Sequence, residues 1–136
     1  MARILEPYPD TVQAVTLLVE EWFPELGPRE DDEFRTGRVF PPNVQQNLPF
    51  CRITDIGGND DGLTDRPLID IDVLAGTFAD ARRLAVGIQA RLLGAPWKAG
   101  PVVLDNVRTA MRPHSVPWDD ERVHRYYASY VVGVRR

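Results

Sequence analysis

Cysteine is nearly absent from the 136 residues and occurs only at Cys51. One cysteine excludes an internal disulfide framework, so we expect the chain to fold in a reducing cytoplasm. No apolar run approaches the roughly 20 residues of a membrane span, and the N-terminus has no signal-peptide core, so no membrane partner is predicted. Cys51 itself is predicted to be a small buried hydrophobe, because nothing marks it as a nucleophile.

An excess of positive charge is also missing, since 16 Lys and Arg face 20 Asp and Glu, for a net charge of −4. A protein that clamps DNA phosphates usually has a basic face, and the composition indicates none. His114 and His124 stand ten residues apart with no further ligand at metal-binding spacing. Ser115 and Ser129 have no triad context. The sequence therefore predicts no cofactor and no metal.

The clearest pattern lies in residues 48–93, which read as a strand, a Gly/Asp-rich turn, a second strand and a helix. In the second strand, apolar residues alternate with Asp70 and Asp72, which predicts one covered face and one open acidic face. Residues 57–62 have the composition of a hairpin turn. Thr77 begins a helix that ends at Gly94. The apolar stripe of this helix consists of Ala81, Leu84, Ala85, Ile88 and Leu92.

The remaining elements give an α-(β)-β-β-α-β-β order in one domain spanning residues 1–136. A first helix begins at Asp10 and ends at Pro24 to Gly27. Strands are predicted over residues 37–40, 102–112 and 122–134. Alternate residues of the last strand share one face, and packing in the core is favoured for its tyrosines. They are Tyr126, Ala128, Tyr130, Val132 and Val134. Strands interrupted by a single helix favour an α+β fold, a small mainly antiparallel β-sheet with two helices packed on one face.

A catalytic interpretation rests on Gly57-Gly58 followed by Asp70-Ile71-Asp72, which is similar to the nucleotidyltransferase signature. Two carboxylates on one strand face, with Asp105 from a later strand, can hold magnesium for phosphoryl transfer. The signature also requires the glycine pair to open a helix, and residues 59–67 are poor helix formers. The structural alternative, a hairpin turn followed by the solvated face of a strand, is favoured.

Two longer stretches carry a family resemblance. They are LPFCRITDIGGNDDGLTDRPLIDIDVLAGTFADARRLA and VVLDNVRTAMRPHSVPWDDERVHRYYASYVVGVRR. Residues 36–136 resemble tail terminator proteins of long-tailed phages of actinobacteria. The matching features are the "LP" strand entry, "IGG", "DRPLIDIDV", "VRT", "PxxVPWD" and "VxRYYASY". The resemblance implies a tail-terminator-like sandwich without catalysis or cofactor.

The resemblance also implies an assembly. It implies a hexameric ring that caps the tail tube, joins it to the head connector or stopper protein, and lets DNA pass as a non-specific cargo. The chain would then reside at the tail–neck junction of the virion, and in the host cytoplasm during assembly. A neighbouring head-closure or tail-completion protein is an alternative. Carboxylates lining the lumen would repel DNA phosphates.

The loops over residues 28–47, 57–64 and 113–120 are predicted to make ring and axial contacts. Phe40 and Trp118 are the predicted apolar anchors, with packing on their own subunit as the alternative. The predicted interface set is Phe40, Asn43, Asn59, Asp60, Asp61, Trp118 and Asp119. The predicted channel-facing set is Asp60, Asp61, Asp70 and Asp72. The alternatives for these carboxylates are an ordinary outer surface or contact with a basic patch on the neighbouring subunit.

Overall fold

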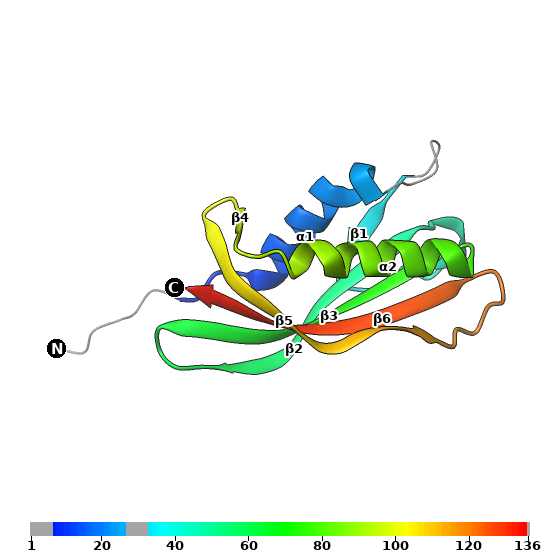
Figure 1. Cartoon of the computed structure of the whole chain (residues 1–136). Helices are drawn as coiled ribbons and strands as arrows, with labels where there is room; N and C mark the ends of the chain where they lie inside the picture. Colours follow the sequence, from blue (N-terminus) through cyan, green and yellow to red (C-terminus); the bar gives the residue numbers. More distant parts are fainter. Residues whose placement is uncertain (1–6, 27–32, 136) are drawn as a thin grey trace.

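A computed structural model describes residues 7–26 and 33–135 of the chain (Figure 1). One six-stranded sheet has the order β1-β2-β3-β6-β5-β4. All neighbouring strands pair antiparallel except β1 and β2, which pair parallel. The strands are β1 (Arg35–Gly37), β2 (Phe50–Asp60), β3 (Thr64–Ala75), β4 (Trp97–Ala99), β5 (Val102–Val116) and β6 (His124–Arg135).

Two helices, α1 (Thr11–Trp22) and α2 (Phe78–Leu92), lie on the same side of the sheet (Figure 1). Both begin at the predicted caps: Asp10 accepts a hydrogen bond from the Gln13 N–H, and Thr77 accepts one from the Asp80 N–H. A short 3-10 helix follows α1 at Phe23–Leu26. The predicted stripe of α2 is confirmed, because all of its residues are buried: Ala81, Leu84, Ala85, Ile88 and Leu92.

The main core lies between the two helices and the sheet face that they cover. Alternate residues of β3 and β6 supply much of it, because successive side chains of a strand point to opposite faces. Those of β6 are Tyr126, Ala128, Tyr130, Val132 and Val134, all buried as predicted. Cys51 is also buried in this core, which confirms its predicted role as a small hydrophobe. The α+β class, with two helices on a mainly antiparallel sheet, is therefore confirmed.

The paired glycines differ from the prediction, because Gly57 and Gly58 lie inside β2 and not in the turn. The pairing of β2 with β3 shifts between Asp55 and Gly58, and both glycines have positive φ, near 117° and 120°. A Cβ on Gly58 would lie 2.2 Å from the Arg66 carbonyl oxygen, so only glycine fits this bulge. The glycines that suggested a turn therefore bend a continuing strand.

The strands of the structure differ from the predicted strands at three other places. The first strand is Arg35–Gly37 and not residues 37–40, and β5 continues to Val116 through the predicted connection 113–120. Residues 94–101, where no strand is predicted, contain β4, which pairs with Val102–Leu104. Residues 28–32 of the predicted loop 28–47, and Gly27, lie outside the described residues. No helix in the described part of the chain is long and apolar enough to cross a membrane.

Candidate functional site

The sheet face without helices carries a second, smaller apolar cluster. Two loops, residues 38–49 and 117–123, fold over this face and bring Phe40 and Trp118 into edge-to-face contact, with ring centroids 5.0 Å apart. The fully buried members of the cluster are Val44, Phe50, Leu74 and Val123. Phe40 and Trp118 are therefore half-buried against their own subunit. Packing of this kind is the alternative to a role as interface anchors.

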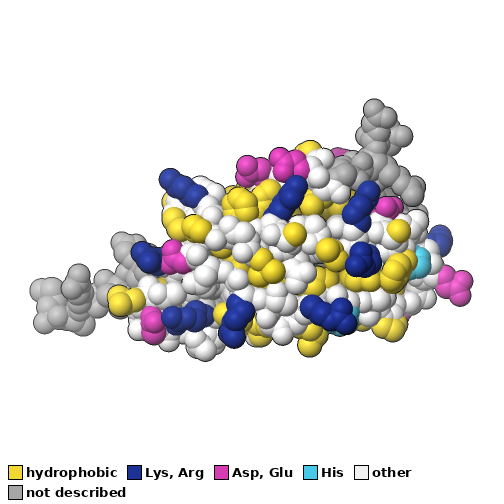
Figure 2. All heavy atoms as spheres, viewed as in Figure 1, with side chains coloured by type: hydrophobic (Ala, Val, Ile, Leu, Met, Phe, Trp, Pro, Cys, Tyr) yellow, Lys and Arg dark blue, Asp and Glu magenta, His cyan; other side chains and the backbone are white. Residues whose placement is uncertain are grey.

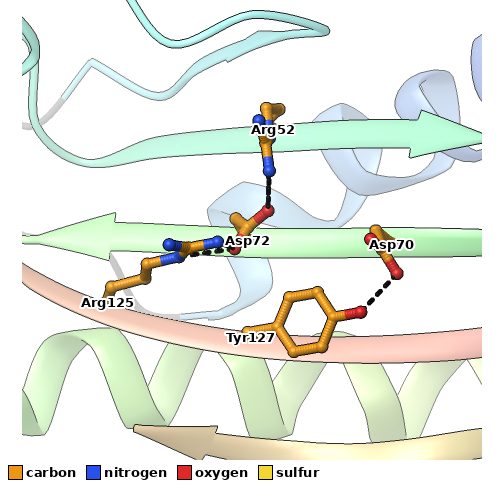
Figure 3. A network of polar contacts seen from close by, with 5 residues as sticks. All are labelled: Arg52, Asp70, Asp72, Arg125 and Tyr127. Carbon is orange, nitrogen blue, oxygen red and sulfur yellow. Dashed lines mark hydrogen bonds and ion pairs between the residues drawn. The ribbon is translucent and has the colours of Figure 1, made fainter. Parts of the chain in front are cut away.

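Beside this cluster, Asp72 is the centre of a buried charge network (Figure 3). Its carboxylate is 0% exposed. Arg52 on β2 donates to Oδ2 from Nη2 at 2.8 Å and from Nε at 3.2 Å. Arg125 on β6 donates from Nε to Oδ1 at 2.7 Å. Because the three residues come from adjacent strands, the network ties β2, β3 and β6 together on the face that the helices do not cover.

Aromatic rings enclose the two guanidinium groups from the loop side. The Arg52 guanidinium lies 4.1 Å from the centre of the Phe40 ring. That of Arg125 lies 5.7 Å from both the Phe40 and the Trp118 rings. Cation–π attraction strengthens in such partly desolvated sites. The loops are thus attached to the sheet through both apolar contacts and the charge network.

Asp70 makes a separate contact on the same face, where it is 8% exposed. The Tyr127 hydroxyl donates to its Oδ1 at 2.6 Å (Figure 3). Burial, followed by the hydrogen bond to Asp70, raises the pKa of Tyr127 to about 12. The phenol therefore stays protonated as a donor to this carboxylate throughout the neutral pH range.

These contacts overturn the prediction that Asp70 and Asp72 form an open acidic face. Two arginines neutralise Asp72, and the loops carrying Phe40 and Trp118 exclude water from it. In this fold Asp72 has no exposed surface through which to face a channel. The alternation of apolar and acidic residues predicts one covered and one solvated face, but both faces of β3 are covered from Ile69 to Ala75.

The three carboxylates of the magnesium interpretation do not converge. Asp72 lies opposite Tyr127 of β6. Asp105 lies at a register shift of β5, next to Asn106, which pairs with Gly133 six residues farther along β6, and so about 20 Å away. Asp105 instead pairs with Arg135 at 2.7 Å. Within the described residues, no group of three or more His, Cys, Asp or Glu side chains is arranged to hold a metal ion. The glycine pair also opens no helix, so this hypothesis lacks both of its requirements.

The other predicted contact residues are exposed. They are Asn43, Asn59, Asp60, Asp61 and Asp119. Asp60 and Asp61 shape the hairpin turn by accepting backbone hydrogen bonds from Gly62 and from Leu63 and Thr64, and Asp61 pairs with Arg66 at 3.3 Å. Their exposure is compatible with either a lumen, an outer surface or a contact between subunits.

Sequence reasoning missed Arg52 on β2 and two residues of β6, Arg125 and Tyr127. Both have odd numbers in β6, opposite in parity to the buried Tyr126 and Ala128, so they could be placed on the other face. The missing information was that β6 pairs with β3, which sets Tyr127 opposite Asp72. Only that pairing brings the arginine and the phenol to the two carboxylates.

Comparison with known proteins is informative at the level of the fold. No family model and no curated protein matches the sequence. A solved structure described as "Virion of native gene transfer agent (GTA) particle" contains a chain with the same fold. That chain superposes with a TM-score of 0.53 at 15% identity, covering 74% of this chain and 78% of the other. At this identity, the likeness shows a shared fold.

Proposed function

We propose that this chain is a structural virion protein of a long-tailed phage or phage-like particle. The observation that carries the proposal is the fold shared with a chain of the gene transfer agent virion. The sequence resemblance of residues 36–136 to tail terminators points the same way, although it rests on different data. A structural role also suits a molecule whose two buried carboxylates, Asp70 and Asp72, tie strands together.

More specifically, we propose that six copies of the chain form a ring at the tail–neck junction. The ring caps the tail tube, stops its growth and joins it to the head connector or stopper protein, while DNA passes through the centre. A small domain forms such a ring when two different surfaces of each copy meet head to tail and the rotation closes. The exposed loops around residues 43, 59–61 and 119 offer surfaces for a neighbouring copy, the tube and the connector.

The proposal assigns no chemical step to the chain. The magnesium interpretation required three converging carboxylates, and Asp72 instead uses both oxygens to bind arginines. If a site for magnesium existed, the cation would raise the melting temperature of the purified protein. We expect no rise with magnesium at millimolar concentration, and a clear rise would reopen the enzymatic alternative.

The decisive experiment adds the purified protein to tail tubes assembled without it. We expect rings at one end of the tubes in electron micrographs, and tubes of fixed length that no longer grow when more tube protein is added. An antibody to the chain should label the neck of intact particles. Labelling of the head side of the neck, with tubes that still grow, would favour a head-closure protein. No labelling of particles would refute the virion assignment.

A further inference from the structure

Two edges of the sheet are open along most of their length. β1 pairs only with Phe50–Arg52 of β2, and β4 pairs only with Val102–Leu104 of β5. Among the described residues, no strand therefore covers the outer edge of β2 from residue 53 to 60 or of β5 from residue 105 to 116. An open edge exposes unpaired N–H and C=O groups that another chain can contact.

The two edges carry opposite charges. Asp55, Asp60 and Asp61 are exposed along β2 and its turn, with Arg66 as a partial counter-charge. Arg108 and Arg112 are exposed on β5, where the charge of Asp105 is paired with Arg135. Hereafter, the acidic edge means residues 53–61 and the basic edge means residues 105–116.

Helix α2 extends the positive side. Arg82 lies with Arg112 and His114 around a hollow of about 440 Å³, and no described residue of its lining is acidic. Figure 2 shows Lys and Arg side chains spread over the face that carries α2, with Asp and Glu nearer its rim. Charge is also distributed unevenly along the sequence. Residues 1–80 contain 16 acidic and 6 basic residues, whereas residues 81–136 contain 4 acidic and 10 basic residues.

Each edge also exposes one large apolar side chain. Ile56 on the acidic edge is 50% exposed, and Met111 on the basic edge is 49% exposed. Burying apolar surface favours association, whereas the flanking charges decide which surface is accepted as a partner. The two edges therefore have what a selective contact needs, an apolar centre with charged flanks.

From these observations we infer that the basic edge of one copy binds the acidic edge of a second copy of this chain. Arg108 and Arg112 face Asp55, Asp60 and Asp61 of the neighbour, and Arg82 lies beside Arg112. Two basic edges repel each other, as do two acidic edges, so a symmetric dimer is disfavoured and head-to-tail addition is favoured. Bulges interrupt both edges, so side chains and not an unbroken ladder make the contact. This inference deepens the proposed ring and rests on it.

Two charge-reversed variants test the contact. R108E/R112E makes both edges acidic, and D55K/D60K makes both edges basic. The variant E21K/E121K is the matched control for D55K/D60K, since it changes net charge equally at two exposed positions away from either edge. Because Asp55 and Asp60 accept backbone hydrogen bonds, D55N/D60N removes the charge while keeping the acceptor oxygen. Circular dichroism checks that each variant is folded.

Self-association is measured by sedimentation velocity at low ionic strength, up to millimolar protein. We expect the unchanged protein and E21K/E121K to associate. Added salt should weaken the association of both, because it screens the charges. Each reversed variant alone should associate at least 10-fold more weakly, and D55N/D60N should also be weaker. An equimolar mixture of R108E/R112E with D55K/D60K should recover association, because each reversed edge then meets an edge of opposite charge.

Three results would overturn the contact. These are a mixture that associates no better than its separate components, reversed variants that associate like the unchanged protein, and no association of any sample.

A fluorescently labelled DNA duplex tests the other use of a basic edge. If R108E/R112E loses DNA binding but keeps self-association, the edge binds nucleic acid and not a second copy. Adding the same variants to tail tubes separates the two proposals. Rings that form regardless of edge charge refute the contact alone, whereas association without any tube binding refutes the tail-capping function alone.

Discussion

Replacing Asp72 with asparagine should destabilise the fold more than any other single charge change on the sheet. The carboxylate is 0% exposed, and it faces two guanidinium groups whose side chains are 27% and 21% exposed. Without the negative charge, Arg52 and Arg125 repel each other in a poorly hydrated site. Removing one partner from a buried ion pair costs about 3–5 kcal/mol. Because both arginines keep some contact with water, we expect the lower limit, about 3 kcal/mol.

Urea unfolding at low protein concentration measures this loss without a contribution from self-association. With an m-value of about 2 kcal/mol per molar, the midpoint should fall by about 1.5 M. D61N, which removes the charge from an exposed ion pair with Arg66, is the matched control and should shift the midpoint far less. Equal shifts for the two variants would refute the argument that Asp72 organises the covered face. Replacing Arg52 and Arg125 by methionine together with D72L should recover much of the stability, since an apolar trio needs no desolvated charge.

Three further predictions concern the same face and its loops. W118A should lower the free energy of unfolding by about 2 kcal/mol, less than for a fully buried aromatic residue; an unchanged value with weaker assembly would make Trp118 an interface anchor instead. Y127F leaves the buried Asp70 carboxylate without its donor and should cost about 2 kcal/mol in urea unfolding, whereas no change would show that water replaces the phenol. The hydrogen bonds from Arg122 hold the pKa of Asp120 at about 2, below the ordinary 3.8, so this contact stabilises the folded state above pH 4 and is lost as pH falls toward 2. An NMR titration of Asp120 should therefore show a midpoint near 2 that returns toward 3.8 in R122A.

Local sequence signals predicted the elements whose determinants are local. Asp10 and Thr77 accept hydrogen bonds at the helix starts, and the apolar stripe of α2 is the one that packs on the sheet. The periodicity of β6 placed Tyr130 in the core, where it is 1% exposed. Such features depend on residues three or four apart in a helix, or two apart in a strand, so they can be recognised without knowing the neighbours.

The errors concern features that depend on distant residues. Whether Gly57-Gly58 is a turn or a bulge depends on how far β3 continues the pairing, and the sequence does not encode that locally. Whether Asp72 is solvated depends on β6 lying beside β3 and on a loop 30 residues upstream folding over the face. An alternating strand shows two unlike faces, but the pattern does not specify what covers the polar one.

The hairpin carboxylates have two proposed roles that compete. If Asp60 and Asp61 line a channel, their charge must remain unneutralised to repel DNA, whereas at the contact with Arg108 and Arg112 it is largely cancelled. Asp72, already neutralised by two arginines, supplies little repulsion in either case. A ring built by the edge contact still has a net charge of −4 from every copy, because pairing the edges changes where charge lies and not its sum. Repulsion of DNA therefore does not require the hairpin to face the lumen, and its carboxylates can determine which surfaces of two subunits meet.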